Sequence, residues 1–97
     1  MKWKLQLLLI INSKTNEIQY HRVVGTHTFT ATTLHYAKAK AMQIAKKNPH
    51  LTPHIQNRPL WRHIGTPETT IATRHYWNSD AYFQYIVMLH LRKETPS

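Results

Sequence analysis

The sequence has no cysteine, and only two of its 97 residues are glycine. Without cysteine the chain can form neither disulfide bonds nor thiolate metal sites, which excludes disulfide-rich scaffolds and thiolate zinc fingers. The two glycines, Gly25 and Gly65, are too few for the glycine-rich loops that hold nucleotide phosphates. What remains is one domain with 41% hydrophobic residues, enough to build a core without covalent cross-links.

Acidic residues are also scarce. Four Asp and Glu stand against thirteen Lys and Arg, which gives a formal net charge of +9. The four acids, Glu17, Glu68, Asp80 and Glu94, fall in predicted turns or near the C-terminus. Two-metal nucleases need clustered carboxylates, so this distribution argues against them. The positive charge favours nucleic acid or an acidic protein surface as the partner.

The eight histidines do not form a recognisable metal motif. His50 and His54 are four residues apart, but they lie in a proline-containing segment rather than on a helix, with no carboxylate nearby. We therefore expect no metal and no cofactor. RNA cleavage without a metal needs only a histidine pair with Lys or Arg on the phosphate, so that activity stays open.

Residues 1–14, MKWKLQLLLIINSK, contain a short apolar run after two lysines. Apolar side chains recur at every second position from Trp3 to Ile11, and this alternation predicts a β-strand with one face in the core. A signal peptide is the alternative, but Gln6 interrupts the run and Asn12-Ser13-Lys14 is a poor cleavage site. The run is also too short to span a bilayer, and we expect no membrane contact.

Residues 17–32, EIQYHRVVGTHTFTAT, follow a polar turn and are rich in β-branched and aromatic side chains. They predict the second arm of an antiparallel hairpin, with Gly25 at a bulge or bend. Residues 32–49, TTLHYAKAKAMQIAKKNP, predict a helix that Thr32 or Thr33 caps and Asn48-Pro49 ends.

The predicted helix has two different faces. The apolar face, directed at the core, consists of Leu34, Ala37, Ala41, Ile44 and Ala45. The opposite face carries Tyr36, Lys40, Gln43 and Lys47. This second face is either a solvated surface whose lysines complement the helix dipole or a row of contacts to phosphates or carboxylates. We take Tyr36, Lys40 and Lys47 as candidate binding residues.

Three more strands are predicted after an irregular loop at 48–59. They are LWRHIG at 60–65, TTIATRHYW at 69–77 and YFQYIVMLHLR at 82–92. The predicted fold is one α+β domain over 1–97, β-β-α-β-β-β, a mainly antiparallel sheet with one helix packed on one face. If 60–65 is an edge strand, two copies of the chain can pair through it as a homodimer.

The last predicted strand alternates cleanly, and it places Phe83, Tyr85, Val87, Leu89 and Leu91 in the core. The strand before it has no clear apolar face. We predict that Arg62, Arg74, Tyr76 and Tyr82 line the sheet face that the helix leaves open. Arginine and aromatic groups there would pair with phosphates and stack on bases. The alternative is a half-buried edge strand whose Tyr and Trp cover the rim of the core.

Taken together, the sequence predicts a non-enzymatic binding protein whose partner is nucleic acid or an acidic surface of a nucleoprotein complex. Short basic chains of this kind are common among phage and mobile-element proteins, including anti-CRISPR-like inhibitors of host defence nucleases that act in the host cytoplasm. Three hypotheses remain open at this point: a direct RNA or DNA binder, an inhibitor that docks on a protein, and a small metal-independent ribonuclease of the toxin type.

Overall fold

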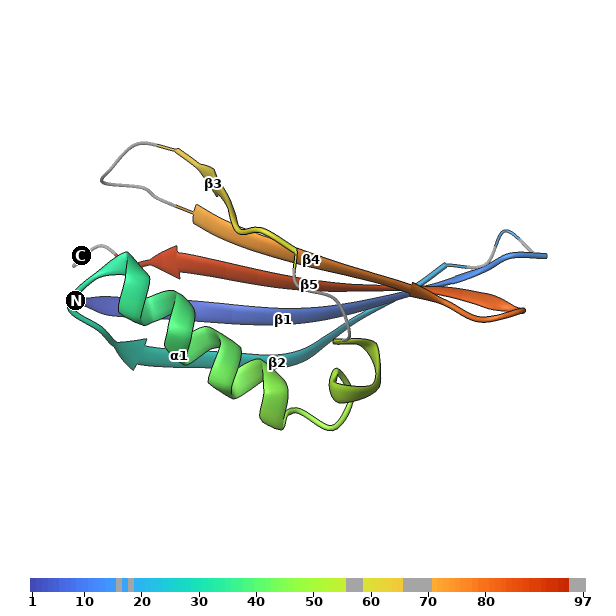
Figure 1. Cartoon of the computed structure of the whole chain (residues 1–97), viewed down its shortest axis with the longest axis horizontal. Coiled ribbons are helices and arrows are strands. Elements are labelled where there is room, and N and C mark those ends of the chain that lie inside the picture. The colour runs from blue at the N-terminus through green and yellow to red at the C-terminus, as the bar shows by residue number, and fades with distance from the viewer. Residues whose placement is uncertain (16, 18, 56–58, 66–70, 95–97) are drawn as a thin grey trace.

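The computed structural model describes residues 1–15, 17, 19–55, 59–65 and 71–94. Its elements are β1 (Lys2–Ser13), β2 (Gln19–Thr30), α1 (Leu34–Lys47), the short 3-10 helix η1 (Thr52–His54), β3 (Arg62–Ile64), β4 (Ile71–Ser79) and β5 (Phe83–Lys93). The strands form one antiparallel sheet in the order β2-β1-β5-β4-β3, and α1 packs on one face of it (Figure 1). The predicted β-β-α-β-β-β fold is therefore confirmed.

The core lies between α1 and the two central strands, β1 and β5. Side chains that are opposite each other in an antiparallel pair project to the same face, so the register defines this core: Leu5 is opposite Leu91, Leu7 opposite Leu89, and Leu9 opposite Val87. Apart from Leu9, these side chains are fully buried. Ala37, Ala41 and Ala45 of α1 are also fully buried, and their small side chains allow the helix backbone to approach the sheet closely.

The boundaries of α1 follow from its capping residues. Thr33 is the N-cap, and its hydroxyl accepts a hydrogen bond from the Tyr36 backbone N–H at 3.3 Å. Asn48 is the C-cap, and its side-chain amide donates to the Val24 carbonyl at 3.2 Å, which ties the helix end to β2. No helix within the described ranges is long and apolar enough to cross a membrane.

The segment after α1 is more ordered than the sequence predicted. Pro53 stands in η1, and Leu51 just before it is fully buried. The prediction of an irregular loop across 48–59 is thus wrong at 52–54, because the first turn of a helix tolerates proline, which there loses no hydrogen bond. Residues 56–58 of that loop lie outside the described residues.

The molecule is elongated, with extents of 45 × 23 × 21 Å, and the two hairpins continue beyond the helix (Figure 1). At this distal end, the turn between β1 and β2 meets the turn between β4 and β5: the Lys14 backbone N–H donates to the Tyr82 carbonyl at 2.9 Å. The Asp80 carboxylate accepts from the Tyr82 and Phe83 backbone N–H groups at 2.8 and 2.7 Å. These bonds fix the turn between β4 and β5.

Two further details of the sheet agree with the sequence. The β1–β2 register shifts between Leu7 and Leu8, which confirms a bulge at Gly25, and a Cβ at Gly25 would meet His27 Nε2 at 3.1 Å. The β3 strand lies at one edge of the sheet, as predicted for 60–65, although it spans only Arg62–Ile64. Pairing of two copies through that edge stays a prediction.

Candidate functional site

The sheet has a second face, opposite α1, which we call the open face. No helix of the described chain lies on it (Figure 1). Its central part consists of the alternate residues of β1 and β5, namely Lys4, Gln6, Leu8 and Ile10 on β1 and Ile86, Met88, His90 and Arg92 on β5. These residues divide the open face into an apolar part and a basic part.

The apolar part, which we call the apolar centre, consists of Leu8, Ile10, Ile86 and Met88, flanked by Val23 and Trp77. Ile10 is buried and the other three central residues are half-buried, so the two flanking residues supply most of the exposed apolar surface. Val23 lies opposite Leu8, and Trp77 lies opposite Ile86. Val23 and Trp77 are 49% and 54% exposed. The central strands are thus apolar on both faces here, which is typical of strands covered on both sides.

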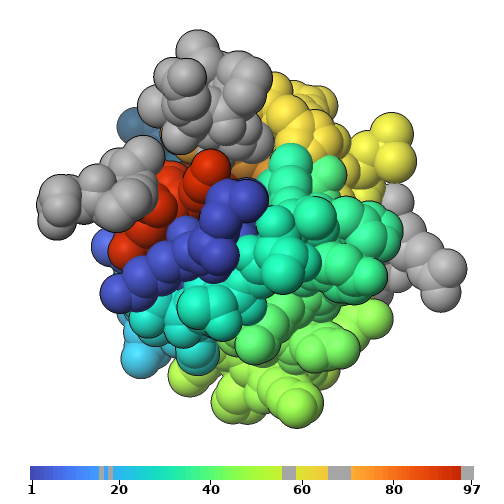
Figure 2. Space-filling view, turned by 90° about the vertical axis from the view of Figure 1, so that its left-hand side faces the viewer, coloured from blue at the N-terminus to red at the C-terminus, as the bar shows by residue number. Residues whose placement is uncertain are grey.

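The basic part is a pocket of about 340 Å³ lined by Lys4, Gln6, Ile71, His90 and Arg92, which we call the basic pocket. Lys4 lies directly opposite Arg92, and Gln6 lies opposite His90. Like charges at opposed positions of an antiparallel pair are destabilising. Among the described residues that line the pocket, two are cations and none is an acid. Figure 2 views this end of the molecule, where the start of β1 (blue) lies beside the end of β5 (red), with α1 (cyan to green) to one side.

Two histidines extend the basic pocket across the sheet. The rings of His75 and His90 lie 6.2 Å apart between their centroids, and His75 Nε2 is buried without a hydrogen-bond partner among the described residues. Burial lowers the pKa of His75, and the nearby Arg62 lowers it further. Burial also lowers the pKa of His90, and His75 adds to that effect. Both rings are therefore mostly neutral at pH 7, since even an ordinary histidine pKa is about 6.5.

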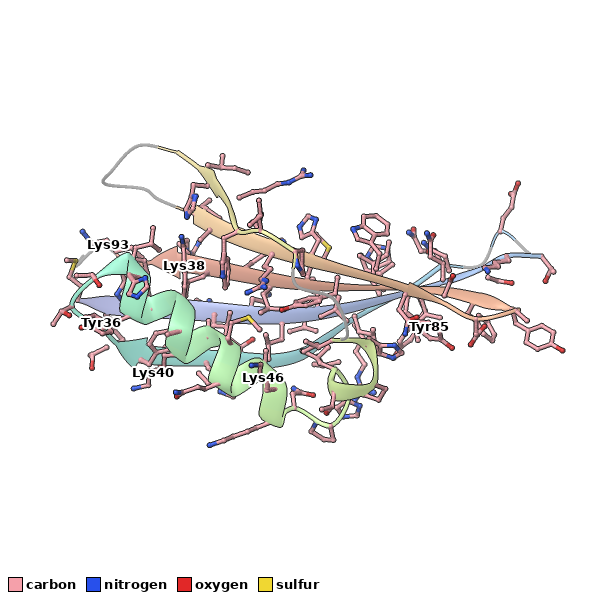
Figure 3. All side chains as sticks on the ribbon, viewed as in Figure 1. Tyr36, Lys38, Lys40, Lys46, Tyr85 and Lys93 are labelled. Atoms are coloured by element: carbon pink, nitrogen blue, oxygen red, sulfur yellow. The ribbon has the colours of Figure 1, made fainter. Side chains whose placement is uncertain are left out.

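The predicted helix residues lie on the other side of the molecule. Tyr36, Lys40 and Lys47 are exposed on the outer surface of α1, as predicted, and Figure 3 shows Tyr36 and Lys40 near its start. Lys40 Nζ lies 5.6 Å from the centre of the Phe29 ring, a cation–π contact. A shallow pocket of about 510 Å³ there includes Thr30 and Tyr36 in its lining. This surface is separated from the open face by the thickness of the sheet.

The predicted placement of Arg74 and Tyr76 on the open face is wrong. They lie opposite Leu89 and Val87, so both project toward α1. Tyr76 is only 2% exposed, and its hydroxyl donates to Met42 Sδ at 3.4 Å. The Arg74 guanidinium lies 5.5 Å from the centre of the Tyr76 ring, on the face of the sheet that α1 covers. The physical reason is the alternation of a β-strand. Ala72 is buried in the core, so Arg74 and Tyr76, two and four residues later, project to the same face.

The other aromatic and arginine residues that the sequence singled out lie either on the open face or toward the distal end of the molecule. Arg62 lies opposite Thr73, on the open face as predicted. Tyr82 is 69% exposed, but it stands at the distal end rather than on the sheet face. Phe83, which the sequence placed in the core, is 40% exposed because the strands continue beyond the helix there. Tyr85 does pack: its ring stacks on His54 at 4.4 Å and its hydroxyl donates to Asp80 at 3.0 Å.

The sequence did not identify Lys4, Gln6, His90 or Arg92 as binding residues. Their common signal is visible in the sequence, because they occupy the non-core positions of the two strands with the clearest alternation. Their proximity depends on the register between β1 and β5, which no local pattern specifies. Among the described residues, no group of three or more His, Cys, Asp or Glu side chains could hold a metal ion.

Comparison with protein-family models, with curated proteins and with solved structures finds no match to this chain.

Proposed function

We propose that this chain is a non-enzymatic binding protein that docks the open face of its sheet on an acidic surface of a nucleic-acid-handling protein complex. The observation that supports this function is the apolar centre. Contiguous apolar surface without a cover is rare on monomeric proteins and marks interaction sites. Val23 and Trp77 keep about half of their surface exposed at the two sides of this centre.

The chemistry of the open face favours a protein over bases as the occupant of the apolar centre. Bases stack on aromatic side chains, but the two central strands present aliphatic residues and Met88 there. Trp77, Met88 and Arg92 belong to the residue types that are enriched at the centres of protein interfaces. The basic pocket at one end of the same face adds positive charge, which complements the overall negative charge of a nucleoprotein surface.

The small size and the charge of +9 fit an accessory protein of a phage or mobile element that inhibits a host defence nuclease in the host cytoplasm. In this setting, the docked surface belongs to the nuclease complex.

A capture experiment with paired variants tests the docking face. Val23→Ser with Trp77→Ser removes apolar area from the open face, and Tyr36→Ser removes a comparably exposed aromatic ring from the helix surface. We expect the wild type and Tyr36→Ser to capture the same protein from host lysate after nuclease treatment, and the double variant to lose it. The readout is mass spectrometry of captured material, with melting temperatures measured on the same preparations.

Two results would contradict the docking proposal. One is capture that disappears on nuclease treatment, because the bridge would then be nucleic acid. The other is equal capture by the double variant and the wild type, because the apolar centre would then be outside the interface.

A metal-independent ribonuclease is the second candidate, because His75 and His90 lie 6.2 Å apart beside Lys4 and Arg92. We expect no cleavage of a labelled single-stranded RNA at pH 7, with Mg²⁺ or with EDTA. Such cleavage needs one protonated and one neutral histidine, whereas burial lowers the pKa of both rings, and His75 does not line the pocket. Cleavage in EDTA that His75→Ala and His90→Ala both abolish would establish the enzyme instead.

A further inference from the structure

The basic pocket has an electrostatic cost that none of its described lining residues compensates. Lys4 and Arg92 are opposed on neighbouring strands, where side chains in an antiparallel pair start about 5 Å apart. Their positive charges project from the same part of the face and repel each other, and the other described lining residues, Gln6, Ile71 and His90, carry no negative charge. An anion between the two cations would turn this repulsion into two attractive contacts.

We infer that the basic pocket binds a phosphate group of a nucleic-acid backbone. This inference rests on the proposed function, in which the open face docks on a nucleic-acid-handling complex. It adds that a nucleic-acid strand of that complex contacts the basic pocket. It uses a separate set of residues, however, since the apolar centre contributes none of the five lining side chains.

The donor set of the pocket fits a phosphate. The guanidinium of Arg92 can donate two parallel hydrogen bonds to two phosphate oxygens, and Lys4 supplies a compact positive charge beside it. Gln6 and His90 are the next opposed pair on the same face and offer neutral donors to the remaining oxygens. A phosphodiester has few accessible oxygens, so these four side chains are enough to surround one.

The surroundings of the pocket favour a strand over a free phosphate ion. Ile71 lies opposite Arg92 and gives the pocket an apolar wall, which suits a sugar ring. The volume of about 340 Å³ exceeds that of a phosphate ion and lies at the lower end of ligand pockets. On the same face, Thr73 lies opposite His90 and is buried, and the exposed Arg62 lies opposite Thr73 on β3. A second phosphate of the strand would therefore meet another cation at Arg62.

The test uses a fluorescent ten-nucleotide oligo-dT as the probe. The pocket pair, Lys4→Gln with Arg92→Gln, is compared with a matched pair on the helix, Lys40→Gln with Lys47→Gln. Each pair removes two positive charges, so a difference between them reports position rather than net charge. We expect the pocket pair to weaken binding about tenfold or more, since one charge-assisted hydrogen bond contributes roughly that factor. The helix pair should weaken binding much less.

Two further measurements sharpen the test. Loss of two phosphate contacts on a single strand should reduce the slope of log affinity against log salt by about 1.4 in the pocket pair. Lowering the pH from 7.5 to 5.5 should tighten wild-type binding, because protonated His90 adds a positive charge to the pocket. The pKa of His90 lies below its ordinary value, so the gain should come late in this range. The gain should be smaller in His90→Gln, where only the neighbouring His75 can still add charge beside the pocket.

Several outcomes would overturn the inference. Equal losses in the two pairs would mean diffuse attraction, and a larger loss in the helix pair would place the contact on α1. Binding of inorganic phosphate without binding of oligo-dT would remove the nucleic-acid part. If oligo-dT does not bind but nuclease-resistant capture still depends on Val23 and Trp77, the inference fails while the proposed function stands. If oligo-dT binds through the pocket and capture fails, the reverse holds.

Discussion

Replacing Leu89 with alanine should lower the free energy of unfolding by about 2–5 kcal/mol, the usual cost of a cavity in a close-packed core. Leu89 is fully buried between α1 and the centre of the sheet, opposite Leu7. Because Leu5, Leu7, Leu91 and the helix alanines surround it, the structure has little freedom to fill the space. Urea denaturation followed by tryptophan fluorescence measures this loss.

Met88→Ala is the matched control for Leu89→Ala. Met88 is the neighbouring residue on β5, but it projects to the open face, where it is only partly buried. The change should cost clearly less than Leu89→Ala, because no helix closes a cavity over it. Equal losses for the two variants would mean that the open face is packed as tightly as the core, and the apolar centre would no longer qualify as a free surface.

Replacing Ala41 with leucine should destabilise the protein by about 1–3 kcal/mol, the typical cost of overpacking. Ala41 is fully buried in the middle of α1, and the small side chains at Ala37, Ala41 and Ala45 allow the helix to lie close to the sheet. A leucine at this position has to displace the helix or adopt a strained rotamer. Thermal unfolding followed by circular dichroism gives the change in melting temperature.

Ala39→Leu provides the comparison for the helix. Ala39 is exposed on the same helix, two residues away, and leucine and alanine have similar helix propensities. Its melting temperature should therefore remain close to that of the wild type. A melting temperature for Ala41→Leu that equals or exceeds this value would contradict close packing of α1, and the position of the helix would need another explanation.

The parts of the fold that the sequence predicted correctly are specified locally. A 3.6-residue period, Thr33 and Asn48 determine α1, and strict alternation with a polar turn determines the first hairpin. The sequence of β4 does not specify which of its faces is buried, because polar Arg74 and apolar Ala72 share one face while apolar Trp77 lies on the other. Alternation alone assigns faces only where one face is clearly apolar, and β4 does not meet that condition.

The candidate site illustrates a different limit. Lys4 and Arg92 come from opposite ends of the chain, and the sequence does not specify that β1 pairs with β5 rather than with β3 or β4. The apolar centre was visible in part, since Leu8 and Ile10 interrupt the polar positions of β1. Apolar residues at these positions are typical of a strand that is apolar on both faces. The alternation from Trp3 to Ile11, taken alone, indicates only one buried face.

The pairing of β1 with β5 also has a consequence for biosynthesis. β1 is made before the other four strands of this sheet, yet its neighbour β5 is made after all of them. During translation, β1 can pair with β2 and meet α1, but its other edge and the apolar residues beside it have no partner until β5 has left the ribosome. Such long-range pairing forms slowly and exposes nascent chains to aggregation. For a protein of this topology, a chaperone that binds the nascent chain would help most in the interval before β5 emerges from the ribosome.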